Sequence, residues 1–215
     1  MAPKDLDIVH PRIMRYLESL IPPRDPVLVE MEERAEREGI PIVGPVVGRL
    51  LYQLALISSA KRVMELGSAI GYSTMWWARG VGPSGTVWYS DASEENAHDA
   101  IAYLERGGVA QRVHVLVGEA VKCMAAVKGK FDIVFCDIDK PGYPAALRAA
   151  MPRLKRGGLL VVDNTLWKGR VTKRWGGDAA TKAVKRLNKL VYASDDWAYS
   201  VVLPLRDGVT VVVKR

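Results

Sequence analysis

Acidic and basic side chains stand together directly after an apolar stretch in the middle of the sequence. The segment FDIVF, residues 131–135, is typical of a buried strand, and it continues into CDIDKPGY, which contains Asp137, Asp139 and Lys140. In open α/β sheets, ligands bind beyond the carboxyl ends of the strands. Two carboxylates and a lysine at such an end therefore indicate part of a functional site.

A glycine-containing turn follows an earlier apolar stretch. The chain reads VMELGSAIGYS from Val63, so that Gly67 and Gly71 stand between a strand and the start of a helix, where a ligand can approach the backbone closely. The spacing excludes two nucleotide-binding motifs. Ala69 and Tyr72 stand where a G-x-G-x-x-G fingerprint needs glycine, and the Gly-Lys-Ser/Thr of a P-loop is missing.

Three more acids lie in or after apolar stretches. Asp91 follows TVWYS and can accept both hydroxyl protons of a ribose, although it and Ser93 are equally suited to cap the next helix. Glu119 and Ala120 would border an adenine ring, but Glu119 could equally be an acid in the first turn of a helix. Glu65 stands inside an apolar strand, where a carboxylate needs a ligand or a backbone amide beside it.

Strand and helix patterns alternate along most of the chain, which implies β-α-β crossovers and a mainly parallel sheet covered on both faces. Two final strands separated by an Asp-Gly turn form a hairpin. The predicted strands span 62–66, 86–90, 113–117, 132–135, 159–162, 199–203 and 209–213, and the predicted helices span 46–57, 73–79, 94–106, 120–127 and 145–154. We therefore predict an α/β fold, a Rossmann-like, doubly wound, mainly parallel seven-stranded sheet with an antiparallel C-terminal hairpin.

The first 40 residues differ from the rest. Helical patterns at 13–20 and 27–38 each combine apolar positions with a charged face. We expect them to form an N-terminal helical cap on a single domain covering residues 1–215, because no repeat, low-complexity tract or linker marks a boundary. The apolar stripe could cover the core of the same chain or that of a partner subunit.

Composition narrows the class of protein. The 215 residues contain no run of 18 apolar residues and begin without the apolar region of a signal peptide, so we expect a soluble, cytoplasmic protein that does not bind membranes. Cys123 and Cys136 have no metal-binding spacing and are expected in the core. Residues 153–189 contain eleven Lys or Arg but two acids, which could attract an acidic partner, although a solvated basic face is commoner.

Taken together, these stretches resemble the class I S-adenosylmethionine-dependent O-methyltransferases, specifically the metal-dependent group that includes catechol O-methyltransferase and caffeoyl-CoA O-methyltransferase. The resemblance runs from about Pro41 to the end and is carried by RVMELGSAIGYST, Asp91, FDIVFCDIDKPGY, GGLLVVDNTLWKGRV and LPLRDGVTVVVK. The pair D-x-D-K-x-x-Y and D-N-x-L-W-x-G-x-V is more specific than any glycine turn.

The resemblance implies that Asp137, Asp163 and Asn164 bind a divalent cation. Two carboxylates and an amide oxygen form an oxygen-only set that suits Mg²⁺, with Mn²⁺ or Ca²⁺ as alternatives. Each residue could singly be a helix cap or a turn residue. Three of them at the ends of successive strands favour a shared site.

The resemblance also implies the reaction. The cation would hold both oxygens of a vicinal diol on an aromatic ring, and Lys140 would be the general base for methyl transfer from S-adenosylmethionine. Alternatively, Lys140 is an exposed lysine paired with Asp139. Trp167 and the cations of 168–174 would overhang the acceptor and could steer an acidic one, or they form a basic surface loop with the tryptophan packed inward.

The cofactor contacts implied by the resemblance are Val43, Glu65, Gly67, Ser73, Asp91, Glu119, Ala120 and Asp137. Two stretches depart from the family pattern: Ala69 replaces a common glycine, and PIVGPVVG, which contains Val43, matches only in outline. Relatives in the family are often dimers, so we expect a homodimer that acts on a small molecule.

Two other functions are consistent with parts of the sequence. The basic C-terminal third suggests an RNA methyltransferase, but DIDK replaces the Asn/Asp-Pro-Pro-aromatic motif usual in methylation of base amines, so we expect no nucleic-acid partner. A non-catalytic protein that binds S-adenosylmethionine is the other alternative. The complete set of implied metal ligands together with Lys140 disfavours it.

Overall fold

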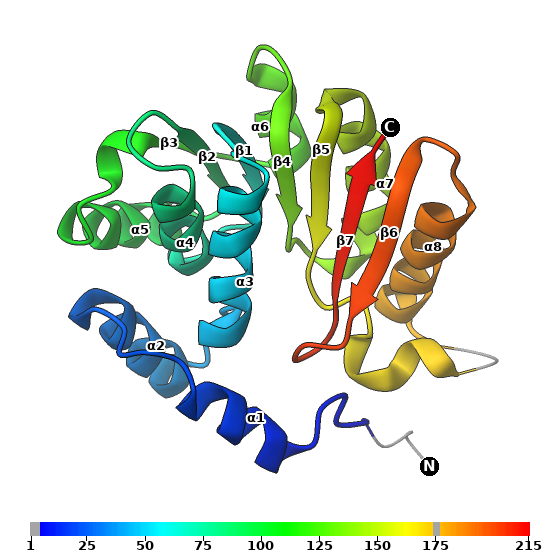
Figure 1. Cartoon of the computed structure of the whole chain (residues 1–215), viewed down its shortest axis with the longest axis horizontal. Coiled ribbons are helices and arrows are strands. Elements are labelled where there is room, and N and C mark those ends of the chain that lie inside the picture. Colours follow the sequence, from blue (N-terminus) through cyan, green and yellow to red (C-terminus); the bar gives the residue numbers. More distant parts are fainter. Residues whose placement is uncertain (1–4, 174–176) are drawn as a thin grey trace.

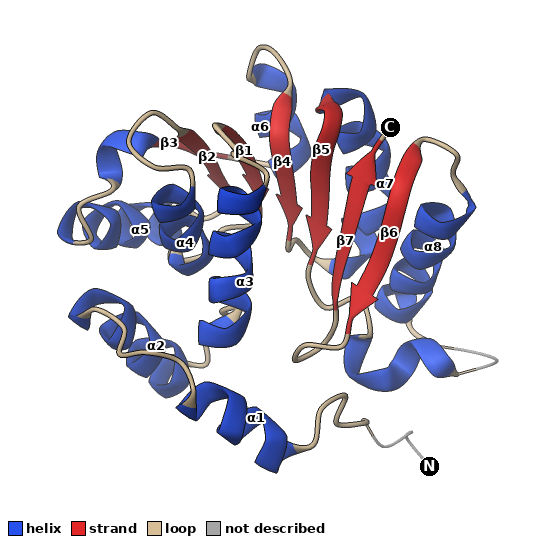
Figure 2. Ribbon diagram, viewed as in Figure 1, coloured by secondary structure: helices blue, strands red, loops and turns tan. Residues whose placement is uncertain are grey.

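The computed structural model describes residues 5–173 and 177–215 and contains one seven-stranded sheet (Figures 1 and 2). The strands are β1 (Arg62–Leu66), β2 (Thr86–Asp91), β3 (Val113–Val117), β4 (Phe131–Cys136), β5 (Leu154–Val162), β6 (Trp197–Leu203) and β7 (Val209–Lys214). Their order is β3-β2-β1-β4-β5-β7-β6, and β7 runs opposite to the other six strands. The predicted mainly parallel α/β sheet with its C-terminal hairpin is confirmed.

Helices cover both faces of the sheet. They are α1 (Pro11–Ser19), α2 (Pro26–Glu38), α3 (Gly44–Ile57), α4 (Tyr72–Gly80), α5 (Glu94–Arg106), α6 (Ala120–Ala126), α7 (Tyr143–Ala150) and α8 (Ala179–Ala193), with 3₁₀ turns η1 (Ala110–Arg112), η2 (Lys140–Gly142), η3 (Met151–Arg153) and η4 (Trp167–Thr172). Helices α3, α4 and α5 pack on one face, and α6, α7 and α8 pack on the other.

The core follows from the alternation of side chains along each strand. In β4, Ile133 and Phe135 join the cluster under α3–α5, whereas Val134 and Cys136 join the cluster under α6–α8. Every other residue of a central strand is therefore committed to one face. Cys123 and Cys136 are both buried and free, as expected of core residues.

One helix was missed by sequence analysis, and both the end of the helix predicted over 145–154 and the start of the strand predicted over 159–162 were wrong. Helix α8 buries Thr181, Val184, Leu187 and Val191 at helical spacing, with lysines and arginines on its other face. This pattern is typical of an amphipathic helix, but the segment was interpreted by its charge alone. The helix predicted over 145–154 ends at Ala150, because Leu154 instead pairs with Phe131 and begins β5.

The two N-terminal helices differ in how they pack. Helix α2 buries Leu28, Met31 and Ala35, so its stripe covers the core of this chain. Helix α1 buries none of its residues and leaves Ile13 and Tyr16 exposed. The homodimer stays a prediction. The exposed apolar residues of α1 are a possible contact surface for it, and light scattering would decide whether it forms. Among the described residues, no helix is both long and apolar enough to cross a membrane.

The parallel strands bring their carboxyl ends to one edge of the sheet, and the backbones of two neighbouring ends touch there. Asp137 N donates to Leu66 O at 2.8 Å. Gly67 has φ +82°, and a Cβ at this position would lie 2.5 Å from Asp137 O. Gly67 is therefore required both by its left-handed backbone and by the close approach of β1 and β4.

We expect Gly67→Ala to lower the free energy of unfolding by about 3 kcal/mol or more, because it combines left-handed strain with a backbone clash. Gly82→Ala is the matched control: its φ is +69°, but no atom lies within 4 Å of the added carbon. That variant should lose only about 1 kcal/mol. Urea denaturation measures both, and equal losses would contradict the close approach.

Candidate active site

A cleft of about 1400 Å³ opens at the carboxyl ends of β1, β2, β4 and β5. The predicted site residues that line it are Val43, Gly67, Ser73, Asp91, Glu119, Ala120, Asp137, Lys140, Asp163 and Asn164. Glu65 and Trp167 lie outside its wall. The fold therefore brings most of the predicted residues together, although they are spread over 122 positions of the chain.

The carboxylate of Asp91 fixes the turn after β1 to the start of α5. Its Oδ2 accepts from Ala69 N at 2.9 Å, and its Oδ1 accepts from Ser93 N at 2.9 Å and from Asn96 Nδ2 at 3.1 Å. Ser93, not Asp91, caps α5 through Asn96 N. Asp91 is half-buried in the cleft wall, in an orientation that these three donors determine. Asn96 also lines the cleft, and sequence analysis missed it.

Two helices begin at this part of the cleft. Glu119 caps α6 by accepting from Val121 N at 2.9 Å and Lys122 N at 3.1 Å, so it directly precedes the helix and does not lie in its first turn. Glu119 still borders the cleft, as does Ser73 in the first turn of α4. The open space therefore faces the amino ends of α4 and α6, which favour polar or negative ligand atoms.

Glu65 is a buried acid behind this wall. It is fully buried, its Oε2 accepts from the Thr74 hydroxyl, and its Oε1 has no partner among residues 5–173 and 177–215. Burial raises the pKa of Glu65 to about 7. Its hydrogen bond with Thr74 connects β1 to the start of α4.

The second half of the cleft contains Asp137, Asp163 and Asn164. Cys136 pairs with Val162 across β4 and β5, so Asp137 and Asp163 follow directly after paired residues. Asp163 is 4% exposed, and its Oδ1 has no partner within the described part of the chain. Burial, together with the nearby charge of Asp137, raises the pKa of Asp163 well above its ordinary value.

This donor set fits a divalent cation. A buried carboxylate oxygen without a hydrogen bond is costly, and a second carboxylate beside it adds repulsion that a cation would relieve. Asn164, which has φ +55° and lines the same cleft, would supply the third oxygen. The described residues contain no group of three His, Cys, Asp or Glu placed to hold a metal.

Lys140 projects from η2 into the same half of the cleft. Its Nζ lies 3.0 Å from Asp137 Oδ1 and 3.3 Å from Ile138 O, so it pairs with Asp137 and not, as the alternative had it, with Asp139. The ammonium lies 4.9 Å from the centre of the Tyr143 ring. Tyr143 is buried, and its hydroxyl donates to Asp163 O at 2.7 Å. Lys140 and Asp163 are thus held by one small cluster.

Trp167 and the described cations that follow it agree largely with the second interpretation, a basic surface loop with the tryptophan packed inward. Trp167 packs against the core cluster under α6–α8, with its ring 5.7 Å from Lys140 Nζ. Arg170 pairs with Asp5 at 2.7 Å. Residues 174–176, which include Arg174 and Trp175, lie outside the described residues, so any steering role for this end of the segment stays a prediction.

We expect Glu65→Gln to flatten the pH dependence of stability. The folded pKa of about 7 exceeds the unfolded value of 4.5, so the contribution of Glu65 to stability is fully present below about pH 4.5, and roughly 3 kcal/mol of it is lost as pH rises through 7. Denaturation of both proteins at pH 4.5 and pH 8 measures this difference. Exposed Glu105→Gln is the control, and parallel profiles for Glu65→Gln and wild type would refute the assignment.

Known sequences match this chain over most of its length. Residues 25–215 match the O-methyltransferase family profile. A catechol O-methyltransferase of Mycobacterium tuberculosis is 35% identical over 179 residues, which cover 82% of this chain and 81% of the relative. A catechol O-methyltransferase of Niastella koreensis is 29% identical over 185 residues, covering 83% and 84%.

Solved structures of O-methyltransferases are also similar to this chain. An O-methyltransferase of Bacillus cereus in complex with S-adenosylhomocysteine has a TM-score of 0.86 at 27% identity, covering 95% of this chain and 97% of that chain. TomG of Streptomyces achromogenes, in complex with S-adenosylmethionine, has a TM-score of 0.85 at 28% identity, covering 94% and 96%. With the cleft and the family match together, the chain belongs to the O-methyltransferase family and is an S-adenosylmethionine-dependent O-methyltransferase.

Proposed function

We propose that this enzyme methylates one hydroxyl of a catechol-like small molecule, with a divalent cation, Mg²⁺ by preference, held by Asp137, Asp163 and Asn164. One observation carries this proposal: a buried carboxylate oxygen of Asp163 has no partner among the described residues, although Asp137 and Lys140 stand beside it. Two relatives named catechol O-methyltransferase support the acceptor class.

When bound, the cation supplies Lewis acidity that lowers the pKa of an acceptor hydroxyl and orients two neighbouring oxygens. The residues around it are suited to that task. Asp163 is fixed by its place after β5, and its backbone carbonyl accepts from Tyr143. Asp137 is fixed by its backbone bond to Leu66 O. The backbones that carry both carboxylates are therefore held in place.

Lys140 is the proposed general base. In its neutral form, Nζ accepts the hydroxyl proton of the acceptor, and the resulting oxygen attacks the methyl carbon of the cofactor. The new bond joins oxygen to carbon, the carbon–sulfur bond breaks, and S-adenosylhomocysteine leaves. Asp137 orients Nζ at 3.0 Å, and the Tyr143 ring limits its freedom on another side.

The cofactor is proposed to occupy the other half of the cleft. Asp91 would accept from the ribose hydroxyls, and Glu119 and Ala120 would border the adenine. Gly67 and Ser73 would face the methionine portion, near Asp137 and Val43. All of them line the cleft. Glu65 does not, and it is proposed to affect cofactor binding by holding the start of α4 through Thr74.

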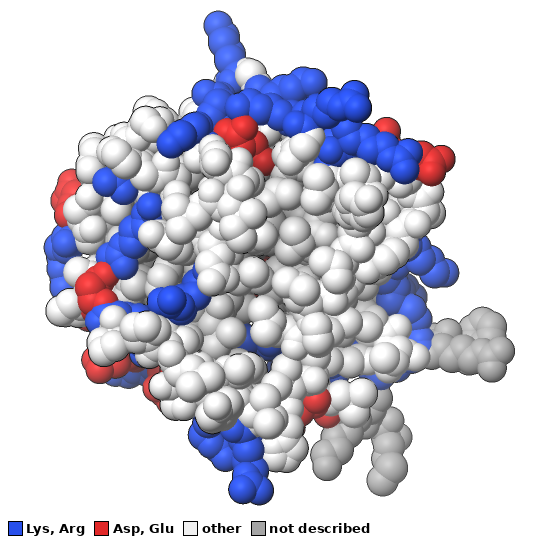
Figure 3. All heavy atoms as spheres, viewed as in Figure 1, with Lys and Arg blue, Asp and Glu red and all other residues white. Residues whose placement is uncertain are grey.

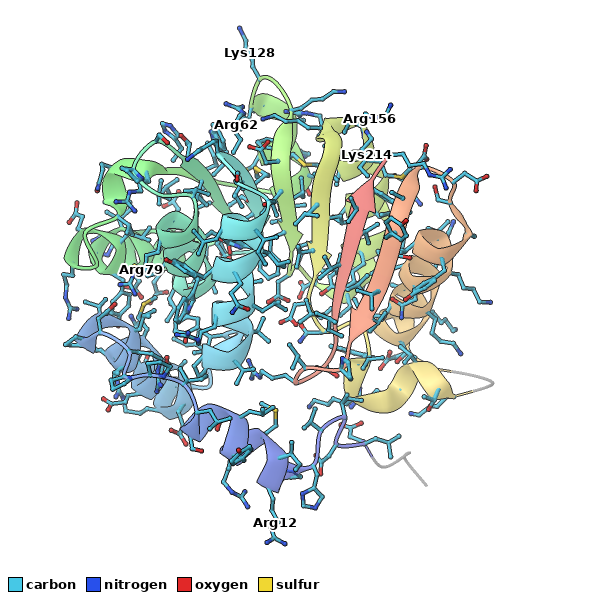
Figure 4. All side chains as sticks on the ribbon, viewed as in Figure 1. Arg12, Arg62, Arg79, Lys128, Arg156 and Lys214 are labelled. Carbon is cyan, nitrogen blue, oxygen red and sulfur yellow. The ribbon has the colours of Figure 1, made fainter. Side chains whose placement is uncertain are left out.

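The distribution of charge favours a small acceptor over RNA. Lysines and arginines form a band along the upper edge in Figure 3, and Figure 4 labels Arg62, Lys128, Arg156 and Lys214 there. In Figure 1, β4 and β5 point away from that edge, so the cleft lies at the opposite end. A second group of cations, Lys182, Lys185, Arg186 and Lys189, lines a separate groove on α8. Phosphates bound along the upper edge would lie at the end of the sheet opposite the cleft.

The direct test is methyl transfer from S-adenosylmethionine to catechol, caffeate and 3,4-dihydroxybenzoate, with Mg²⁺ and again with excess EDTA. We expect a methoxy product with Mg²⁺ and a loss of at least about 100-fold with EDTA, restored by adding Mg²⁺ back. The affinity for S-adenosylhomocysteine, measured without metal, is the control and should remain. Transfer that is unaffected by EDTA would reject the metal, and no transfer to any diol would reject the acceptor class.

A further inference from the structure

We infer that the acceptor carries an anionic group, such as a carboxylate, and that Arg206 binds it. This inference rests on the proposed function, because it concerns the same cleft and the same diol. Arg206 lies in the turn between β6 and β7 and lines the cleft together with Asp163 and Asn164. It would therefore select among diols and would not take part in the chemistry.

The first observation concerns how the cations of the cleft are partnered. Three of them line it: Arg24, Lys140 and Arg206. Arg24 pairs with Glu32 at 2.8 Å, and Lys140 pairs with Asp137 at 3.0 Å. Arg206 has no carboxylate within ion-pair distance among residues 5–173 and 177–215. Its recorded hydrogen bond runs from Nη1 to the neutral carbonyl of Ile42 at 2.6 Å. A guanidinium has five N–H donors, so most of them are available to a ligand.

The second observation is that the backbone provides a place for this side chain. Arg206 has φ +47°, a left-handed conformation that costs a non-glycine residue about 1 kcal/mol. Opposite it, Gly44 also has positive φ, and a Cβ there would lie 3.0 Å from Nη1 of Arg206. The left-handed backbone of Arg206 and the lack of a side chain at Gly44 are both consistent with a functional constraint on the position of the guanidinium.

The third observation is that the turn is fixed to the half of the cleft proposed for the acceptor. Thr165 N donates to Gly208 O, and Leu166 N donates to Asp207 O, each at 2.9 Å. These bonds join the turn to the loop that begins with Asn164. An anionic substituent on the ring of a diol held at Asp163 and Asn164 would therefore lie in the field of Arg206.

The cofactor offers the same chemistry, because its methionine end carries a carboxylate and Ile42 is adjacent to Val43. A planar guanidinium can bind either carboxylate through two hydrogen bonds. The neighbouring contacts favour the acceptor, because the turn is bonded to the Asn164 loop. The experiment must nevertheless separate these two sources.

Arg206→Gly suits the test, since glycine adopts φ +47° without strain and the substitution removes the charge. We would compare kcat/KM for 3,4-dihydroxybenzoate with that for 4-methylcatechol. The ratio of the acid to the neutral diol should fall about tenfold in Arg206→Gly. Arg206→Lys should recover part of that loss, because it keeps the charge but not the two-pronged geometry. Arg24→Gln removes a paired cation from the same cleft, and its ratio should stay within about twofold of wild type.

An unchanged ratio in Arg206→Gly would overturn the inference. An unchanged ratio with a raised Kd for S-adenosylhomocysteine would instead assign the guanidinium to the cofactor. Calorimetric titration of each diol into the protein loaded with S-adenosylhomocysteine and Mg²⁺ tests Arg206 separately from the proposed function, since binding needs no turnover. If wild type methylates no diol, the proposed function fails. If the wild type binds the acid more tightly than the neutral diol and Arg206→Gly loses this preference, the role of Arg206 is still supported. If the wild type shows no such preference, or the variant keeps it, the role of Arg206 is rejected.

Discussion

Two aspartates end neighbouring strands, and the pairing of those strands keeps their carboxylates together. The register that pairs Cys136 with Val162 is set by buried side chains on both faces of β4 and β5, and a shift of one residue would turn every one of them to the wrong face. The core therefore holds Asp137 and Asp163 side by side in spite of their mutual repulsion. Lys140 offsets part of that repulsion, and a bound cation would offset the rest.

Asp137 links the two halves of the cleft. Its backbone contacts Leu66 and Gly67 at the end of β1, where the proposed cofactor half begins, while its side chain contacts Lys140 in the proposed acceptor half. A methyl group must pass from one half to the other, so the distance between them matters most. Because Gly67 lets β1 and β4 approach so closely, the backbone sets this distance.

Much of the fold was predictable because its signals are local. Apolar runs of strand length, each followed by a helical pattern, specified the central strands, and the acids after those runs marked the edge of the sheet that is functional. Helix α8 was missed although Val184 and Leu187 stand at helical spacing, because the segment was interpreted only as a run of basic residues.

The site was harder to predict where one residue has two possible partners. Spacing alone could not decide whether Asp91 or Ser93 caps α5, since both precede it, and the answer depends on Ala69 N arriving from another strand. Arg206 was not predicted as a site residue, although it lies in the stretch LPLRDGVTVVVK. Its role depends on Ile42 and Gly44, which are more than 160 positions away in the sequence and meet it only in the folded chain.

The most direct test of this account is single-turnover methyl transfer to catechol by Lys140→Ala, with Mg²⁺ and saturating S-adenosylmethionine. We expect a rate about 100-fold or more below wild type at pH 7 and a smaller deficit at high pH, where the acceptor ionises by itself. Affinity for S-adenosylhomocysteine should be retained, and Lys122→Ala, an exposed lysine on α6, should match wild type. A Lys140→Ala enzyme as fast as wild type at pH 7 would contradict the account.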